Sequence, residues 1–575
     1  MPRDWLLDRA RDLVTNTGST QPPGADILTE STTCLFRGRS FSFATFAVAR
    51  PDGLSPLRSI VLVVGLLSVV GCEPPAEPSS CDPPRGPSVS WFVPSANGLD
   101  FSYEASEDEF KGAGLAVADL TGDGLADVVA GRRGGGLALF ENLGGLRFQE
   151  VTVAAGLDPT ASAFALAVAD LDGDGDREIV VAADEVTRIF DNVGNGRFVE
   201  AKALSTPGST EHVLPVDLDG DGLLDLYLSN YDIYVEARSE NQLYRNRGGL
   251  VFDAPVAAGA GASWAASALD VDGDGDLDLY VANDTLLADL GGEPPSSSRL
   301  PADLLLRNDG IDETGALRLT DIATEMGLAT PRSSMGGLVA DFDRDGVLDL
   351  YVSDFGPNKL FLGSIGQRFV EAAVPAGIAA GRRFHADCTT NVRGCLLLSW
   401  SATKADFDLD GRDELLITTG EARQGDTPPV LLFSQTDDGG WLERDPGIPC
   451  INARAGVASD LDDDGDLDLV LAPKDGPLAL YENRAARQGG WLRVALSGTA
   501  GRDGIGARVI ARFADGHSVV RAVGAGGVVH ASTPTDVHFG LGTVALEAIE
   551  VEWPSGRRSI VPDPPVGTIL RVNEP

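Results

Sequence analysis

Seven short acidic segments recur along this chain, and each lies between two apolar runs. All follow the pattern Asp-x-Asp-x-Asp-Gly-x-x-Asp or a close variant, and they begin at Asp119, Asp170, Asp217, Asp270, Asp341, Asp406 and Asp460. Side-chain oxygens occupy positions 1, 3, 5 and 9 of each segment, and glycine occupies position 6. A hard cation such as Ca²⁺ prefers roughly six to eight oxygen ligands. The pattern therefore predicts a Ca²⁺ site in every segment, and we call the segments acidic turns 1 to 7.

The predicted ligands are the residues at positions 1, 3, 5, 7 and 9 of each turn. Position 7 varies freely because only its backbone carbonyl is expected to bind the cation. In chain order the predicted ligand residues are Asp119, Thr121, Asp123, Leu125, Asp127, Asp170, Asp172, Asp174, Asp176, Glu178, Asp217, Asp219, Asp221, Leu223, Asp225, Asp270, Asp272, Asp274, Asp276, Asp278, Asp341, Asp343, Asp345, Val347, Asp349, Asp406, Asp408, Asp410, Arg412, Glu414, Asp460, Asp462, Asp464, Asp466 and Asp468. Turn 1 carries Thr121 where the other turns have aspartate, so we expect it to bind the cation least well.

The surrounding pattern excludes an EF-hand. That motif needs a glutamate at position 12 and flanking helices. Position 12 is apolar in every copy: Ala130, Val181, Leu228, Val281, Val352, Ile417 and Leu471. These residues lie in short runs rich in β-branched and aromatic residues, which favour strands. Each acidic turn is therefore expected to join two strands.

The segments recur about every 50 residues, which indicates a repeat architecture. Each unit adds a short strand ending in Asn or Gly and, after a glycine-rich turn in most units, a strand built around Phe or Leu. Four strands per unit favour a β-propeller over a solenoid. The predicted fold is all-β, with a seven-bladed propeller over residues 89–487. The stretch Trp91–Val93 is expected to supply the outer strand of blade seven and so close the ring.

Residues 488–575 form a separate tail. Apolar and polar residues alternate in at least five stretches, which predicts antiparallel strands in a small β-sandwich or barrel with its own core. The run Gly524–Gly527 lacks the Lys-Ser/Thr of a phosphate-binding loop and is interpreted as a β-turn.

Both parts resemble known families. The repeats resemble the FG-GAP/VCBS type of the integrin α-subunit propeller, in which the same acidic turn binds Ca²⁺. The tail stretches Gly504–Ala507, His538–Gly542 and Val551–Gly556 are similar to the ASPIC/UnbV domain. Together they resemble the cartilage acidic protein family and its bacterial relatives, and this resemblance implies a fold and a metal rather than a defined activity.

Composition narrows the function classes. The 575 residues carry a net charge of −41, which disfavours nucleic acid as a partner. Only five histidines occur, and His538 in the tail has no Cys or Ser nucleophile pattern beside it. We therefore expect a non-catalytic Ca²⁺-binding propeller for adhesion or for binding a protein or glycan ligand. The alternatives are a polysaccharide hydrolase or lyase that uses the propeller channel, which would need His, Tyr, Arg and free carboxylates there, and a scaffold of a surface complex.

The N-terminal region predicts export. Residues 60–70 form an apolar run typical of a signal peptide, and Cys72 follows as in a bacterial lipobox. We expect residues 1–71 to be a leader whose start is mis-assigned, residues 72–88 to be a tether, and Cys72 to carry the lipid. The protein would then be lipid-anchored or secreted, touching the membrane only through that anchor. The alternative is a short buried apolar segment beside a chance cysteine.

Two further cysteines, Cys388 and Cys395, are close enough in sequence to predict a disulfide in an oxidising compartment. Cys81 and Cys450 form a second candidate pair. No second Cys pair or His pair accompanies Cys388 and Cys395, so a zinc site is not expected.

Overall fold

The computed structural model describes residues 27–36, 39–48, 89–95, 98–103, 113–231, 240–284, 302–329, 332–380, 397–420, 428–436, 439–498 and 503–575. The chain divides into two units, residues 1–76 and 77–575. In the first unit, β1 (Ile27–Phe36) and β2 (Arg39–Val48) pair as an antiparallel hairpin. The apolar run 60–70 and the residues Cys72, Cys388 and Cys395 lie outside the described residues. Among the described residues, no helix is long and apolar enough to span a bilayer.

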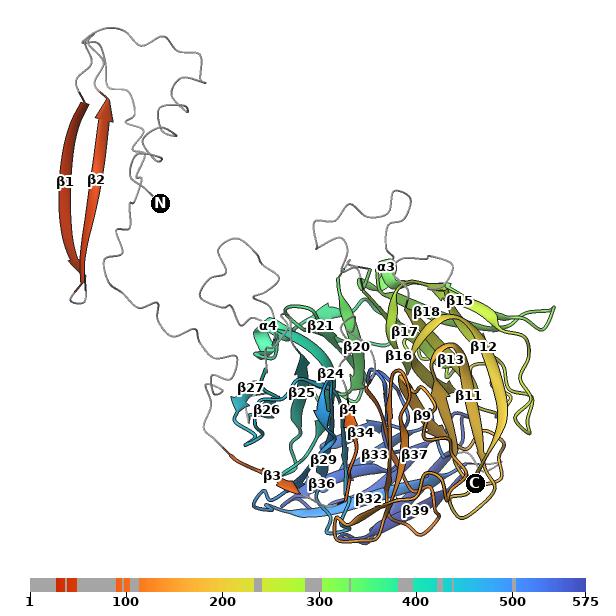
Figure 1. The fold of residues 1–575 in the computed structure, drawn as a ribbon. Helices are drawn as coiled ribbons and strands as arrows, with labels where there is room; N and C mark the ends of the chain where they lie inside the picture. The colour runs from red at the N-terminus through yellow and green to blue at the C-terminus, as the bar shows by residue number, and fades with distance from the viewer. Residues whose placement is uncertain are drawn as a thin grey trace. The chain divides into compact units, whose positions relative to one another are not determined.

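The second unit contains seven four-stranded antiparallel blades (Figure 1). Blade 1 contains β5 (Ala113–Ala118), β6 (Asp127–Arg132), β7 (Leu137–Asn142) and β8 (Phe148–Glu150). Blade 2 contains β9 (Ala165–Ala169), β10 (Glu178–Ala182), β11 (Asp184–Asn192) and the start of β12 (Phe198–Val216). Blade 3 contains the end of β12, β13 (Asp225–Tyr231), β14 (Glu240–Tyr244) and β15 (Val256–Ala260). Blade 4 contains β16 (Ser263–Leu269), β17 (Asp278–Asn283), β18 (Leu304–Ile311) and β19 (Leu317–Asp321). Blade 5 contains β20 (Ser334–Ala340), β21 (Asp349–Asp354), β22 (Lys359–Leu362) and β23 (Val370–Glu371). Blade 6 contains β24 (Leu398–Ala405), β25 (Glu414–Gly420), β26 (Leu431–Gln435) and β27 (Trp441–Arg444). Blade 7 is β28 (Ala453–Ser459), β29 (Asp468–Pro473), β31 (Ala479–Asn483) and β3 (Phe92–Ser95).

The innermost strands surround a central channel and close into a ring. Each inner strand contacts the inner strand of the next blade, and β28 of blade 7 contacts β5 of blade 1. β12 is long enough to serve as outer strand of blade 2 and inner strand of blade 3, so those blades share one curled seven-stranded sheet. The predicted all-β propeller is therefore confirmed.

The ring closes through β3, the first strand of the second unit, as predicted. β3 pairs antiparallel with β31, so that Phe92 lies opposite Asn483 and Ser95 opposite Leu480. A second short pair, β4 (Ser102–Tyr103) with β30 (Gly476–Pro477), lies beside this closure. Joining both ends of the propeller in one blade leaves no unpaired edge at the seam.

Hydrophobic cores lie between neighbouring blades. Alternate residues of each strand face opposite sides, so every blade contributes apolar side chains to two cores. Phe140 and Leu115 of blade 1, for example, pack with Val457 and Val470 of blade 7. Helical turns α3 (Ala323–Met326) and α4 (Ala373–Ala376) follow the outer strands of blades 4 and 5, and Ala323 and Ala373 are fully buried there.

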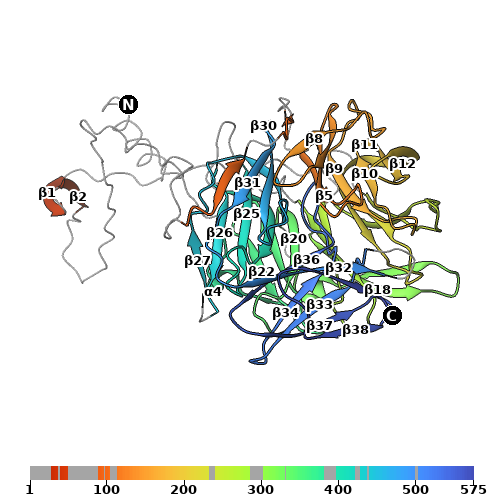
Figure 2. The same ribbon diagram turned by 90° about the horizontal axis from the view of Figure 1, so that it is seen from below.

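The tail forms two sheets around its own core, as predicted. One sheet contains β32 (Gly490–Ser497), β36 (Val537–Gly542) and β39 (Ile569–Asn573), and the other contains β33 (Arg508–Phe513), β34 (Ser518–Ala522), β37 (Leu546–Glu552) and β38 (Arg558–Pro562). The expectation of purely antiparallel pairing was wrong, because β32 and β39 run parallel. The strands β33, β34, β37 and β38 lie together below the blades in Figure 2.

Candidate metal centres in the acidic turns

The carboxylate at position 1 holds every acidic turn in the same backbone conformation. In turn 4, one oxygen of Asp270 accepts a hydrogen bond from Gly273 N at 2.7 Å, and the other accepts one from Gly275 N at 3.2 Å. The bond from the position-6 glycine recurs in all seven turns at 2.7 to 3.2 Å. This glycine has φ between 87° and 98° throughout, a left-handed conformation that side-chain-bearing residues rarely adopt.

The position-5 carboxylate stabilises the second half of the turn. One of its oxygens accepts a hydrogen bond from the position-7 N–H in all seven turns, at 2.8 to 3.2 Å. In turn 6 the position-7 side chain also takes part, because the Arg412 guanidinium pairs with Asp410 at 2.6 Å. In turn 7 the position-7 side chain, Asp466, pairs with Arg487 at 3.0 Å. The bond from the position-7 N–H is common to all seven turns and needs no particular side chain, which agrees with the variable sequence of this position.

Ligand-position oxygens converge in the turns. One oxygen each from positions 1, 3 and 9 lies within 4.8 Å of the others in turns 2, 4, 5 and 6, and in turn 3 the converging set comes from positions 1, 3 and 5. Five buried side-chain oxygens at ligand positions, four of them carboxylate oxygens, have no hydrogen-bond partner: Thr121 Oγ1, Glu178 Oε1, Asp341 Oδ1, Asp408 Oδ1 and Asp462 Oδ1. A buried carboxylate oxygen without a donor is costly unless a cation neutralises it. The donor set therefore fits a hard cation.

In the cation-free protein, burial raises the pKa of these carboxylates. It raises the pKa of Asp127, Asp278 and Asp349 to about 7, that of Asp225 to about 8 and that of Glu178 to about 9. Neighbouring carboxylates in the same turn push these pKa values in the same direction. A divalent cation would reverse the effect, because it favours the ionised form of every ligand.

The position-9 carboxylate has a second, structural role. In turn 1, one oxygen of Asp127 accepts a hydrogen bond from Leu120 N at 2.9 Å, and the other accepts one from Asn142 N at 2.8 Å. The first bond ties position 9 to position 2 of its own turn in all seven cases. Position 9 thus connects the turn to the third strand of its blade as well as offering a ligand oxygen.

Amide side chains connect six of the seven turns to the next blade, a role that the sequence did not reveal. Asn142 ends β7 of blade 1, and its Nδ2 donates to the carbonyl of Leu461, position 2 of turn 7, at 2.8 Å. Equivalent bonds of 2.7 to 3.2 Å come from Asn192, Asn246, Asn308, Gln435 and Asn483. Blade 5 has Gly363 at this place, and Gly366 N instead donates to the Val271 carbonyl at 2.9 Å. The recurrent strand-ending Asn was the available signal.

Arginines lie beside only some turns. Arg245 pairs with Asp219 of turn 3, and Arg247 lies 3.7 Å from Asp219 and from Asp221. In turn 7, Arg493 lies 3.6 Å from Asp460, and Arg487 pairs with Asp464 and Asp466. Among the described residues, no lysine or arginine forms an ion pair with a ligand position of turn 4. The turns therefore differ in how strongly they depend on a cation.

A segment of the tail, residues 524–532, occupies the central channel; we call it the channel segment. Its β35 (Ala531–Ser532) pairs parallel with β5, so that Ala531 lies opposite Leu115. Gly527 accepts a hydrogen bond from Gly337 N at 3.2 Å, and its own N–H donates to Ala266 at 3.0 Å. The interpretation of Gly524–Gly527 as a β-turn was wrong, because these residues bond to β16 and β20 instead of connecting two hairpin strands.

The channel holds buried polar groups that the sequence analysis did not assign. His530 and Glu211 are fully buried, and His530 Nε2 lies 3.0 Å from Glu211 Oε2. His530 has φ of 63°, and its ring lies against Trp264 and Trp400. Burial and the nearby His530 lower the pKa of His212 to about 3. His530 thus pairs with Glu211 in a closed space, and His212 Nδ1 accepts a hydrogen bond from Ala266 N at 3.4 Å. These buried groups hold the channel segment in place.

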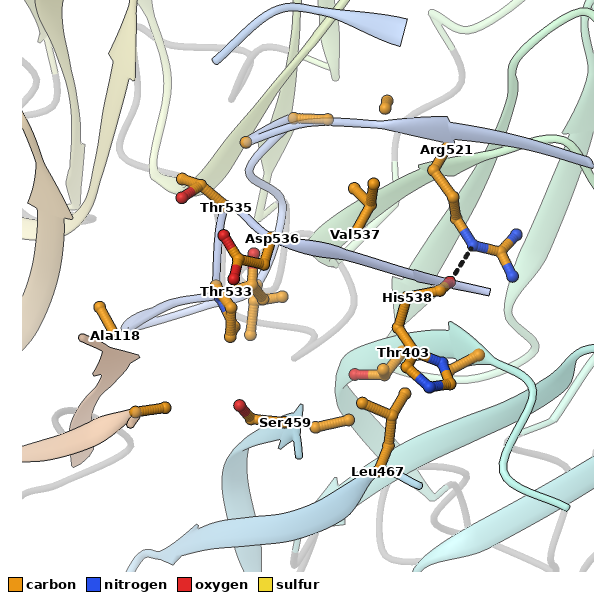
Figure 3. A pocket seen from close by; sticks show the side chains of 18 of the residues that line it. Ala118, Thr403, Ser459, Leu467, Arg521, Thr533, Thr535, Asp536, Val537 and His538 are labelled. Atoms are coloured by element: carbon orange, nitrogen blue, oxygen red, sulfur yellow. Dashed lines mark hydrogen bonds between the residues drawn. The ribbon is translucent and has the colours of Figure 1, made fainter. Parts of the chain in front are cut away.

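A cavity of about 210 Å³ remains between the tail and the ends of the inner strands (Figure 3). Thr533, Thr535 and Asp536 of the tail line it on one side. Arg521 on another side donates to the His538 carbonyl at 3.3 Å and pairs with Asp413 of turn 6. The cavity is therefore part of a polar contact between tail and propeller.

Comparison with known proteins agrees with both parts of the chain. The FG-GAP-like repeat model matches residues 119–181, 170–228 and 230–281, and the model described as ASPIC and UnbV matches residues 498–575. Cartilage acidic protein 1 of Homo sapiens is 25% identical over 525 residues, covering 81% of this chain and 74% of that protein. The Mus musculus protein is 25% identical over 487 residues, covering 77% and 70%.

Among solved structures, a lectin of Agrocybe aegerita that recognises non-reducing terminal N-acetylglucosamine shares 18% identity. The match covers 58% of this chain and 82% of the lectin, with a TM-score of 0.31. So low a TM-score carries no argument about function. The sequence matches are the informative ones: the chain contains FG-GAP-like repeats and an ASPIC/UnbV domain, and it is homologous to cartilage acidic protein 1 over most of its length.

Proposed function

We propose that this protein is a non-catalytic, Ca²⁺-stabilised propeller outside the cytoplasm that serves adhesion by binding a protein or glycan ligand. One observation carries the proposal: seven turns share the same hydrogen-bonded conformation, and in at least five of them three ligand-position carboxylates converge within 4.8 Å. The repeats and relatives also favour an extracellular, adhesion-type role.

Calcium fits the turns better than other common cations. The side chains at positions 1, 3, 5 and 9 all offer oxygen ligands, whereas Zn²⁺ in proteins is usually held by Cys and His. Mg²⁺ demands near-octahedral geometry and keeps several waters, whereas Ca²⁺ accepts more oxygens in flexible arrangements. Five potential ligands in nine residues suit the larger, more tolerant cation.

The cations would stabilise the ring rather than act on a substrate. Each turn lies between two strands of its blade, and in most blades an amide from the next blade bonds to its position-2 carbonyl. A cation that fixes the turn also fixes that carbonyl. Calcium binding is therefore coupled to contact between blades, and in that way to folding.

The channel gives little support to the alternative of a polysaccharide hydrolase or lyase. It contains the kinds of residue that such chemistry would require, including Glu211 and His212. However, both are almost completely buried, and the channel segment fills the space between the inner strands with backbone hydrogen bonds. Catalysis needs groups that a substrate can reach. We therefore propose that the protein is not an enzyme.

The ligand is proposed to be a protein or a glycan, and nucleic acid is disfavoured by the net charge of −41. A scaffold of a surface complex is the second candidate, favoured by turns such as turn 4, whose residues Gly273 to Asp276 are exposed. Membrane attachment is proposed to occur only through a lipid on Cys72. Cys450 is disulfide-bonded, which agrees with an oxidising compartment.

Binding can be tested with the full mature chain on a glycan array and against surface proteins captured in millimolar Ca²⁺. We expect a defined ligand in Ca²⁺ and its loss in EDTA. Asp274→Asn serves as a variant that weakens cation binding in one exposed turn only. Incubation with acidic polysaccharides tests separately for cleavage. Release of new reducing ends would favour the enzyme, and ligand binding unchanged by EDTA would contradict a calcium-dependent binding protein.

A further inference from the structure

The acidic turns differ sharply in exposure although their ligand positions are equivalent. In turn 4, the four consecutive residues Gly273 to Asp276 are exposed. In turn 6, every residue from Asp406 to Glu414 is buried or half-buried. Turn 4 borders a cleft of about 630 Å³ that separates it from the tail, whereas the tail lies directly on turn 6. A cation would therefore leave the two turns by different routes.

Glycines of the tail allow its backbone to lie directly on turn 6. A Cβ atom on Gly540 would lie 2.0 Å from Asp406 Oδ2, and one on Gly542 would lie 2.6 Å from the Asp410 carbonyl oxygen. Real Cβ atoms do not approach so closely, so a side chain at either place would displace the tail. Both glycines belong to the His538–Gly542 stretch of the tail, and the contact with turn 6 explains why that stretch needs them.

Polar contacts join the tail to the same turn. Gln488 N donates to the Asp408 carbonyl at 2.9 Å, and Gln488 Nε2 donates to Asp408 Oδ2 at 2.7 Å. At position 8 of the turn, Asp413 pairs with Lys404 and with Arg521 of the tail. Asp413 thus carries its own cationic partners, and its charge does not compete for a metal.

One oxygen of Asp408 remains for a cation. Asp408 is 8% exposed, and its Oδ1 is buried without a hydrogen-bond partner. One oxygen each of Asp406, Asp408 and Glu414 lies within 4.8 Å of the others. Asp408 thus contacts the tail through Oδ2, while its Oδ1 accepts no hydrogen bond and remains available to a cation.

We propose that turn 6 is a closed cation site whose exit is covered by the tail, with Gln488, Gly540 and Gly542 as its positioning residues. This inference rests on the proposed calcium binding. The cation neutralises the carboxylates beneath the tail, and the tail must move before the cation leaves. Turn 6 therefore releases its ion slowly, whereas open turns such as turn 4 exchange freely with solvent.

Release kinetics test the inference with the full chain. Protein loaded with Ca²⁺ is freed of excess ion and mixed rapidly with a fluorescent chelator, and the amplitude of each phase counts ions per chain. We expect a fast phase and a slow phase of about one ion. Asp408→Asn should abolish the slow phase, and Asp274→Asn should reduce only the fast phase. Gln488→Ala should accelerate the slow phase about tenfold by removing a hydrogen bond to a charged group.

Arg484→Ala is the matched control for Gln488→Ala, since Arg484 is exposed and pairs with Glu482. It should leave both phases unchanged. Amide hydrogen exchange at Gln488 N and Gly542 N should accelerate when the slow ion is removed. A single fast phase, or a slow phase that survives Asp408→Asn, would overturn the closed site while leaving calcium binding intact. Absence of any bound ion in the loaded protein would instead refute the proposed calcium binding itself.

Discussion

Asn142 offers a direct way to measure how one blade is joined to the next. It is 1% exposed, and its Nδ2 donates to Leu461 of turn 7 at 2.8 Å and to the Ala126 carbonyl at 3.0 Å. Its Oδ1 accepts from Gly144 N at 2.9 Å. Asn142→Ala removes these three hydrogen bonds and leaves buried carbonyls without a donor. At about 1 kcal/mol for each bond, the free energy of unfolding should fall by about 3 kcal/mol.

That loss converts into a melting shift. About 2.1 cal/mol/K per residue over residues 77–575 gives an unfolding entropy near 1 kcal/mol/K, so Asn142→Ala should melt about 3 °C below wild type in saturating Ca²⁺. The measurement is differential scanning calorimetry, with exposed Asn573→Ala as control. Asn142→Asp keeps the shape but turns a carboxylate toward two carbonyls, so it should melt lower still. An Asp variant that melts with wild type would refute the hydrogen-bond explanation.

Three other predictions concern the acidic turns and the N-terminal cysteine. In EDTA, the free energy of unfolding should fall as pH rises from about 4 to 8, because the folded state holds protons on carboxylates such as Asp127 and Glu178, whose pKa values are raised to about 7 and about 9 by burial. In millimolar Ca²⁺ it should instead rise with pH, since protons compete with the cation, and chemical denaturation at several pH values distinguishes the two trends. Asp274→Ala should lower the number of bound ions more than Thr121→Ala, because turn 1 already lacks one carboxylate; equal losses in equilibrium dialysis would contradict this order. Mass spectrometry of membrane fractions should find lipid on Cys72 and no leader, and an intact peptide spanning Val70 to Glu73 in the mature protein would count against the anchor.

Local pattern explains why so much of the propeller could be predicted. The ligand spacing and the position-6 glycine define each turn within nine residues, and the apolar runs on either side define the strands. The closure also followed from a short pattern, since Phe92 and Val93 resemble the outer strand near Phe369. All of these contacts form within one blade or at its edge.

Contacts between distant residues could not be predicted in the same way. Alternation identified the strands of the tail but not their partners, so the parallel pairing of β32 with β39 was missed. The glycines of the channel segment and the pair of His530 with Glu211 have no local signature, because their environment comes from several blades. The cover over turn 6 depends on Gly540, whose role is visible only when Asp406 lies beside it.

The central claim is that calcium in the acidic turns stabilises the propeller, and calorimetric melting with and without calcium tests it most directly. A cation at a hundredfold excess over its dissociation constant stabilises by about 2.7 kcal/mol per site. Seven independent sites would give roughly 19 kcal/mol, or about 19 °C at an unfolding entropy near 1 kcal/mol/K. We predict a melting temperature higher by more than 10 °C in millimolar Ca²⁺ than in EDTA. Superimposable melting curves would contradict the claim.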